Sequence, residues 1–236
     1  MYKRQHPNGL IAAALANMGE RFGFYIMMAI LTLFISAKFG LSETTTGYIY
    51  SAFYASIYIL ALAGGIIADK TKNFKGTILA GLVMMAVGYL IIAIPTPTPV
   101  PSMGLYLGLT CFGLLVIAFG NGLFKGNLQA LVGQMYDDPK YSSLRDSGFQ
   151  IFYMFINIGG FFAPWIAIGV RNWWLKVNNF DYDATLPELC HQFLKEGDKM
   201  APQAMENLTA LADKVTLDGS HVADICLLYT SPSPRD

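Results

Sequence analysis

The sequence predicts an all-α membrane protein, because five long apolar segments follow one another and few charges interrupt them. Of the 236 residues, 54% are hydrophobic and 14% are charged, whereas soluble domains carry about 25% charged residues. A membrane-spanning helix needs about 20 apolar residues, and each segment approaches or exceeds that length. We therefore expect spanning helices over residues 10–37, 46–68, 77–94, 103–134 and 147–170.

Charges are rare inside these five segments. The first segment holds Glu20 and Arg21 near its middle, the fourth holds Lys125, and the other three hold none. A charge at that depth costs roughly 2.5–3.5 kcal/mol on insertion scales, so such residues normally face a polar cavity. A surface or helix-end salt bridge is the alternative for Glu20 and Arg21, but the flanking apolar runs place the pair near mid-span.

The connecting segments alternate in positive charge, which predicts the orientation. By the positive-inside rule the N-terminus is cytoplasmic, and five crossings leave the chain outside at Arg171. Trp173 and Trp174 then stand where an interfacial aromatic belt is expected. Because no small-residue cleavage site follows the first segment, we expect it to be retained as a helix. The basic residues of the cytoplasmic side are Lys3, Arg4, Lys70, Lys72, Lys75, Lys140 and Arg145, whereas the outer connections carry only Lys38.

Residues 171–225 differ from the preceding membrane segments, and we expect them to form an extracytoplasmic soluble segment. Residues 172–225 contain four lysines against nine acidic residues. Helical apolar spacing predicts two short helices over 186–194 and 204–215. His191 and His221 are interpreted as solvated side chains, because neither has a metal-ligand partner at suitable spacing.

Residues 226–236 have the sequence of a translated sequencing-library adapter, CLLYTSPSPRD. We expect this segment to be non-native and leave it out of the fold prediction. A genuine polar tail is the alternative.

Polar side chains recur on one face of several predicted helices. Residues four apart share a helix face, as Asn17, Arg21 and Tyr25 do in the first segment, while Glu20 lies about 100° round from Arg21. These faces predict a common cavity, although interhelical hydrogen bonding alone would equally explain Gln150 and Asn127. The corresponding sets in the other helices are Tyr50, Tyr54 and Tyr58; Asn121, Lys125 and Gln129; and Gln150, Tyr153 and Asn157.

Other sequence features bear on packing and on the class of protein. The GxxxG pairs Gly104/Gly108 and Gly122/Gly126 predict close helix packing, and Gly159-Gly160 marks a bend in the fifth helix. The three cysteines form no metal or redox motif, and no catalytic constellation is present, so the sequence does not predict an enzyme. The net charge of zero gives no indication of nucleic-acid binding.

Four segments in order between residues 17 and 160 carry family motifs. They are Asn17-Met-Gly-Glu20-Arg21-Phe-Gly-Phe24-Tyr25, Gly64–Lys70, Phe124-Lys125-Gly126-Asn127 and residues 152–159. Together they resemble the proton-dependent oligopeptide transporter (POT) family of the major facilitator superfamily. The first resembles the family's ExxERFxYY motif, the second its loop signature after the second helix, the third its fourth-helix lysine segment and the fourth its fifth-helix signature. The resemblance implies the N-terminal half of a two-half helical bundle, with the sixth helix and the C-terminal half missing from this chain.

The resemblance also implies roles for individual residues. Arg21, Tyr25 and Lys125 match positions that receive the peptide carboxylate, Tyr58 a position lining the site, and Asn157 a contact to the peptide backbone or amino end. Glu20 matches a proton-coupling carboxylate. The sequence departs from the family motif at two positions, with Asn17 in place of a glutamate and Phe24 in place of a tyrosine. Since Asn17 cannot titrate, proton coupling rests on Glu20 or on acids outside this chain. Asp69 falls in the gating loop, and further cavity-lining positions are Asn17, Phe24, Tyr54, Asn121, Gln129 and Tyr153.

The implied activity of the intact protein is symport of di- and tripeptides with protons across the bacterial inner membrane. Its partners would be peptides, protons, the lipid bilayer and the missing C-terminal half, with no nucleic acid and no cofactor other than the coupling proton. The 236 residues alone are not expected to transport. The alternatives are a related facilitator for another anionic or drug-like substrate, a membrane enzyme, and a receptor whose outer segment carries specificity.

Overall fold

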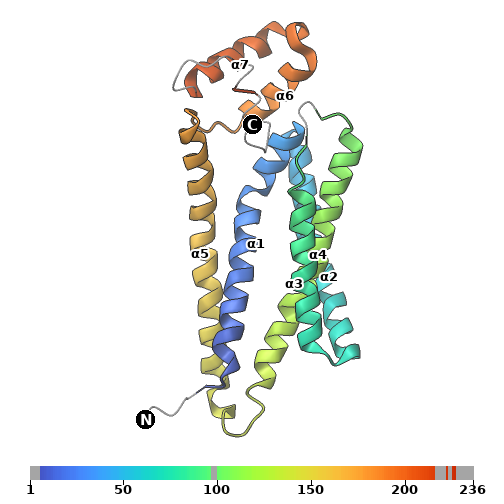
Figure 1. Cartoon of the computed structure of the whole chain (residues 1–236), viewed down its shortest axis with the longest axis vertical. Helices are drawn as coiled ribbons and strands as arrows, with labels where there is room; N and C mark the ends of the chain where they lie inside the picture. The colour runs from blue at the N-terminus through green and yellow to red at the C-terminus, as the bar shows by residue number, and fades with distance from the viewer. Residues whose placement is uncertain (1–5, 97–99, 216–221, 223–224, 227–236) are drawn as a thin grey trace. The chain divides into compact units, whose positions relative to one another are not determined.

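The computed structural model is built of helices, and it describes residues 6–96, 100–215, 222, 225 and 226 (Figure 1). Five of the helices are long and apolar enough to cross a membrane, where intrahelical hydrogen bonds satisfy the backbone without water. These five are α1 (Gly9–Phe39), α2 (Glu43–Thr71), α3 (Phe74–Ile92), α4 (Met103–Gln134) and α5 (Arg145–Val177). Two shorter helices follow, α6 (Leu186–Glu196) and α7 (Pro202–Val215).

The predicted helices are confirmed, and most of them differ from their predicted bounds by a few residues at one or both ends. Three of the differences matter here. Helix α5 continues to Val177 instead of ending at residue 170, because the charge of Arg171 marks the edge of the apolar run and not the end of the helix. Lys38 lies in the last turn of α1 instead of a connection. Asp69 lies in the last turns of α2 and is exposed, so the predicted gating-loop position is helical.

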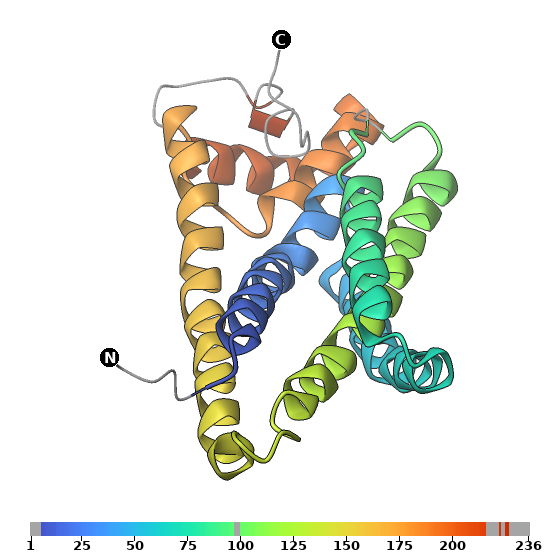
Figure 2. The same cartoon turned by 60° about the horizontal axis from the view of Figure 1, so that its bottom comes forward.

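The chain divides into two compact units, the first made of Met1–Met27, Ala52–Ile92 and Phe112–Ile166. In this first unit α4 lies beside both α2 and α3 (Figures 1 and 2). Glycines allow these approaches: a Cβ on Gly122 would lie 2.5 Å from the Leu60 carbonyl oxygen of α2, and one on Gly120 would lie 2.7 Å from the Gly81 carbonyl oxygen of α3. Small residues at helix interfaces let backbones pack this closely.

The predicted GxxxG pairs are only partly responsible for this packing. Gly122 contacts α2, but a Cβ added to Gly104, Gly108 or Gly126 would meet no neighbouring atom within 4 Å among the described residues. The Gly104/Gly108 prediction is therefore wrong for this part of the chain, since spacing alone does not indicate which helix face meets a neighbour.

Helix α5 packs against α1 through Gly159 and Gly160 in the first unit. A Cβ on Gly159 would lie 3.0 Å from the Met18 carbonyl oxygen, and one on Gly160 would lie 3.1 Å from the ring of Tyr25. These two glycines therefore bring α5 close to the polar stretch of α1.

The second unit comprises Met28–Ser51, Ala93–Cys111 and Ala167–Asp236. In it, Lys38 is 4% exposed and its Nζ donates a hydrogen bond to the carbonyl oxygen of Ile94, 2.9 Å away. Its ammonium group also lies 5.3 Å from the centre of the Phe34 ring. Lys38 thus satisfies a backbone acceptor just beyond α3.

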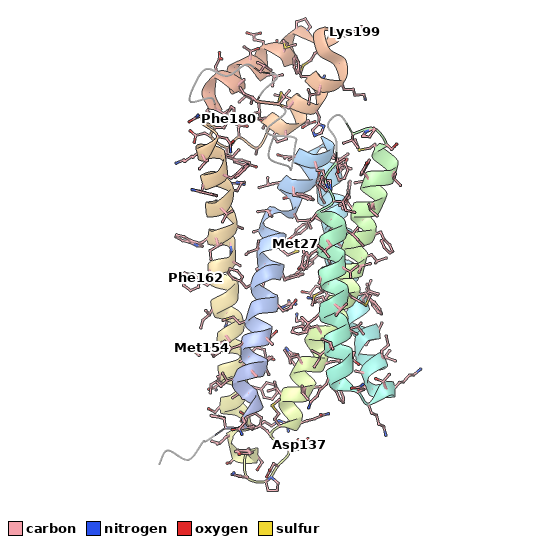
Figure 3. The ribbon with its side chains drawn as sticks, viewed as in Figure 1. Met27, Asp137, Met154, Phe162, Phe180 and Lys199 are labelled. Atoms are coloured by element: carbon pink, nitrogen blue, oxygen red, sulfur yellow. A yellow bond between two sulfur atoms is a disulfide. The ribbon has the colours of Figure 1, made fainter. Side chains whose placement is uncertain are left out.

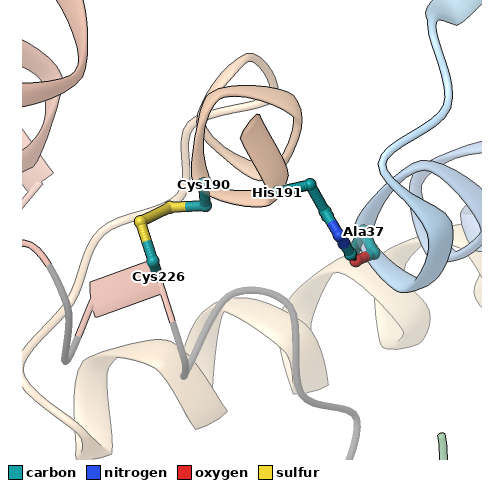
Figure 4. Close-up of a disulfide and its surroundings, with 4 residues drawn as sticks. All are labelled: Ala37, Cys190, His191 and Cys226. Atoms are coloured by element: carbon teal, nitrogen blue, oxygen red, sulfur yellow. A yellow bond between two sulfur atoms is a disulfide. The ribbon is translucent and has the colours of Figure 1, made fainter. Parts of the chain in front are cut away.

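Helices α6 and α7 form a small apolar core of their own, together with the end of α5. The core contains Leu186, Leu208 and Ile225, all fully buried, and a disulfide joins Cys190 to Cys226 (Figure 4). The sequence predicted both helices but no cysteine pairing. Cys226 is also the first residue of the segment interpreted as adapter-derived, and residues 227–236 lie outside the described residues.

His191 connects α6 to the end of α1. Its Nε2 donates to the carbonyl oxygen of Ala37 at 2.6 Å (Figure 4), and its ring covers Gly40, whose φ of +62° suits glycine. The prediction that His191 is solvated is therefore wrong, whereas His221 lies outside the described residues.

Candidate functional site

The central feature of the first unit is an ion pair between neighbouring residues of α1. Nε of Arg21 lies 2.5 Å from Oε2 of Glu20, and Nη2 lies 2.6 Å from Oε1. The two side chains are 6% and 4% exposed, respectively. Their Cα atoms stand about 100° apart on the helix, but both side chains are long enough to curve around the helix and meet. A bidentate guanidinium–carboxylate pair is among the strongest polar contacts in proteins.

Helix α4 contributes a third group to this pair. Nδ2 of Asn121 donates to Oε1 of Glu20 at 3.0 Å, so Glu20 accepts hydrogen bonds from two helices. Asn121 is fully buried, and its Oδ1 has no hydrogen-bond partner among the described residues. The sequence placed Asn121 in the cavity lining without predicting that it binds Glu20.

An aromatic ring lies against the guanidinium group of Arg21. Its guanidinium carbon lies 4.7 Å from the centre of the Phe24 ring, and Phe24 meets Tyr25 edge to face. Phe24, which stands where the resemblance expects a tyrosine, is 5% exposed. Without a hydroxyl it offers Arg21 only its ring face, so the guanidinium is held by Glu20 and by a cation–π contact.

A second group of side chains is more accessible. The hydroxyls of Tyr54 and Tyr58 on α2 lie 3.0 Å apart, and these side chains are 45% and 58% exposed. Lys125 on α4 is exposed and interacts electrostatically with Arg21, Glu20 and Tyr54. The first unit therefore brings a buried ion pair, an accessible cation and two phenols together from three helices.

Tyr89 of α3 also belongs near this group, although no sequence pattern indicated it. Its phenol interacts electrostatically with Glu20 and Arg21. Tyr89 is the one polar side chain in its part of an otherwise apolar helix, so no repeating polar face marked it in the sequence.

The remaining predicted residues have different surroundings. Asn17 is buried, Gln129 is half-buried, and Tyr153 and Asn157 are exposed. Tyr153 and Asn157 share a shallow pocket along α5 with Gln150 and with Met154 and Phe162, two residues labelled in Figure 3. No described contact joins Tyr153 or Asn157 to the ion pair. Asn127 is buried and donates to the carbonyl oxygen of Gly64, which supports the interhelical-hydrogen-bond interpretation for this residue.

This geometry suits binding of an anion coupled to a protonation event. An ionised Glu20 neutralises Arg21, and a protonated Glu20 would free the positive charge of Arg21. The charge of Lys125 lies close enough to respond to that change.

Comparison with known proteins supports the POT family resemblance. The POT family model matches residues 75–183. Dipeptide and tripeptide permease A of Cronobacter turicensis is 37% identical over 154 residues, and that of Escherichia coli K12 is 34% identical. The crystal structure of a mutant of the peptide transporter POT in complex with sulfate superposes with a TM-score of 0.62 at 26% identity, covering 94% of this chain.

These matches support the chain as a fragment of a POT family protein. Its helices correspond to the N-terminal half of a major-facilitator-type bundle, and it spans 28% of the length of these curated relatives and 46% of the crystallised transporter. The POT family model covers Asn121, Lys125 and Asn157 and ends at residue 183, before α6. Helices α6 and α7 thus lie beyond the segment that the family model matches.

Proposed function

We propose that the intact protein is a symporter that carries di- and tripeptides together with protons across the bacterial inner membrane. The permease names of the relatives and the peptide transporter with a similar fold support this assignment. The observation that carries it is the buried Glu20–Arg21–Asn121 group beside the exposed Lys125. Such a transporter needs no cofactor besides the coupling proton, and no enzymatic step is assigned to it.

Within this proposal the two halves of the ion pair have separate roles. Arg21 and Lys125 bind the peptide carboxylate, while Tyr25 and Tyr58 line the site and Asn157 contacts the peptide backbone or amino end. Glu20 takes up the proton. Protonation of Glu20 removes the partner of Arg21, and a substrate carboxylate then replaces it. Binding of peptide and uptake of a proton therefore favour each other.

The positive charge of the connecting segments supports a cytoplasmic N-terminus. With that orientation, α6 and α7 lie on the outer side of the membrane, after the fifth crossing. We further propose that Asp69 belongs to an inner gating segment at the end of α2, and that Tyr153 and Gln129 line the substrate path.

The test separates proton coupling from substrate binding. In the intact protein, reconstituted in vesicles, Glu20→Gln should abolish proton-driven accumulation of a labelled dipeptide but preserve exchange of labelled for unlabelled dipeptide. Glu43→Gln, at the exposed start of α2, serves as the matched control and should keep both activities. Full accumulation by the Glu20→Gln variant would refute the assigned role.

Competition distinguishes peptide transport from transport of another anion. An unlabelled tripeptide should inhibit dipeptide uptake, and Lys125→Gln should weaken that competition. Inhibition by an unrelated organic anion, without inhibition by the tripeptide, would instead favour a different substrate class.

A further inference from the structure

The second unit contains a charged pocket that the proposed transport site does not use. Its volume is about 440 Å³, and it lies between the end of α5, the segment after it, and the end of α7. Phe180 and Val215, both buried, are its apolar lining residues. Its remaining lining residues are Arg171, Asn172, Lys176, Asp181, Tyr182, Asp183 and Lys214.

The cations of this pocket come from two helices and exceed the acids. Arg171 and Lys176 belong to α5 and Lys214 to α7, whereas Asp181 and Asp183 are the two acidic residues. The pocket therefore carries a formal excess of one positive charge. It suits a ligand with one negative charge.

Arg171 is held in a fixed orientation. Its guanidinium carbon lies 3.6 Å from the centre of the Tyr182 ring, and its Nε and Nη2 donate to Oδ1 of Asn172 at 3.2 and 3.1 Å. A planar guanidinium fixed in this way is well suited to phosphate, which it binds through two parallel hydrogen bonds.

Asp183 is also fixed. Its Oδ1 accepts hydrogen bonds from the backbone nitrogen of Thr185 at 2.9 Å and from the Thr185 hydroxyl at 2.6 Å. These hydrogen bonds lower the pKa of Asp183. The carboxylate is therefore ionised at neutral pH, and it favours a ligand that offers a hydroxyl or ammonium group next to its negative charge.

The position of the pocket along α5 indicates the source of the ligand. Arg171 and Lys176 follow the apolar run that ends at residue 170. Trp173 and Trp174, between them in sequence, are 62% and 41% exposed. Exposed tryptophans at the end of a spanning helix mark the membrane–water interface. Arg171 and Lys176 then stand at the level of the lipid headgroups, where phosphate groups are concentrated.

We propose that this pocket binds the phosphate group of a phospholipid headgroup. Arg171, Lys176 and Lys214 hold the phosphate, and Asp181 and Asp183 face its hydroxyl- or ammonium-bearing substituent. Because Lys214 lies on α7, a bound headgroup connects the spanning helix α5 to the outer helices. This inference does not depend on the proposed transport activity.

The test measures retained lipid by native mass spectrometry of the intact protein, taken from vesicles of phosphatidylethanolamine and phosphatidylglycerol. The unmodified protein should retain a phospholipid, and the double variant Lys176→Gln/Lys214→Gln should lose it by at least severalfold. Lys70→Gln/Lys75→Gln removes two exposed lysines at the other ends of spanning helices and should retain the lipid.

Two further measurements make the result decisive. Lys214→Gln alone should reduce retention, because Lys214 lies on α7, which is not among the candidate spanning helices, and lines the pocket. Equal retention by Lys214→Gln and the unmodified protein, or equal loss in the Lys70/Lys75 control, would overturn the proposal. Release of the lipid by millimolar inorganic phosphate would likewise overturn it, since the pocket would then be a site for soluble phosphate. Circular dichroism of each variant checks that it folds.

Discussion

Gly122 offers a sharp test of the backbone packing between α2 and α4. An added Cβ would lie 2.5 Å from the Leu60 carbonyl oxygen and 2.9 Å from the backbone nitrogen of Ala61. The first distance is 0.9 Å below the 3.4 Å at which ordinary van der Waals contact begins. Both neighbours are backbone atoms, so a side-chain rotation cannot relieve the clash. Overpacking of this kind costs about 1–3 kcal/mol.

Gly126, one helical turn further along α4, is the matched control because a Cβ added there would have no neighbour within 4 Å among the described residues. Alanine favours a helix over glycine by about 1 kcal/mol at either position, so this contribution cancels when the two variants are compared. We expect Gly122→Ala to be about 1–3 kcal/mol less stable to unfolding than Gly126→Ala. Unfolding of the purified protein in detergent, followed by circular dichroism, measures the difference. Equal stability of the two variants would refute the described packing of α2 on α4.

Three further predictions concern other parts of the chain. Burial lowers the pKa of His191 below its ordinary 6.5, so the stability that the neutral His191 contributes is present above pH 6.5 and is lost as the pH falls below it. Thermal unfolding measured between about pH 7.5 and 5 should show this loss, and the pH dependence of stability should be weaker in His191→Gln. Lys38→Met leaves the Ile94 carbonyl without its donor and should lower the free energy of unfolding by about 1–3 kcal/mol. Lys70→Met, at an exposed position, should change it little. Equal destabilisation by the two substitutions would contradict the described hydrogen bond. Sequencing of the source locus should give a native sequence that departs from this chain at Cys226, and recovery of the same eleven residues would exclude the adapter origin.

The five spanning helices could be predicted because hydropathy and length determine them almost alone. Their exact ends could not be predicted in the same way. Helix α5 continues through Arg171, since long basic side chains can reach water from the end of a spanning helix. Lys38 was assigned to a connection because of its charge, but a backbone carbonyl acceptor and aromatic rings allow it to be buried.

Sequence spacing could indicate several residues of the candidate site, but not the contacts among them. Helical spacing placed Arg21, Tyr25 and Lys125 on polar faces, but it could not show that Arg21 binds its own neighbour Glu20 or that Asn121 completes the group. The Asn121 contact depends on how α4 is placed against α1. Tyr89 could not be identified, because a single polar residue in an apolar segment forms no repeating pattern. The pairing of Cys190 with Cys226 likewise depends on the fold of α6, which sequence spacing does not provide.

The ion pair of α1 has a consequence for the biogenesis of the protein. Because Glu20 and Arg21 are neighbours on one helix, they can pair before any other helix is present. Helix α1 is synthesised before the other four spanning helices, and at that stage neither Asn121 nor Lys125 is available. An isolated charge would enter the bilayer at a cost of roughly 2.5–3.5 kcal/mol, whereas this helix can enter with its two charges already neutralising each other. The Glu20–Arg21 pair, to which Asn121 of α4 later adds a hydrogen bond, thus first lowers the cost of inserting α1 into the membrane.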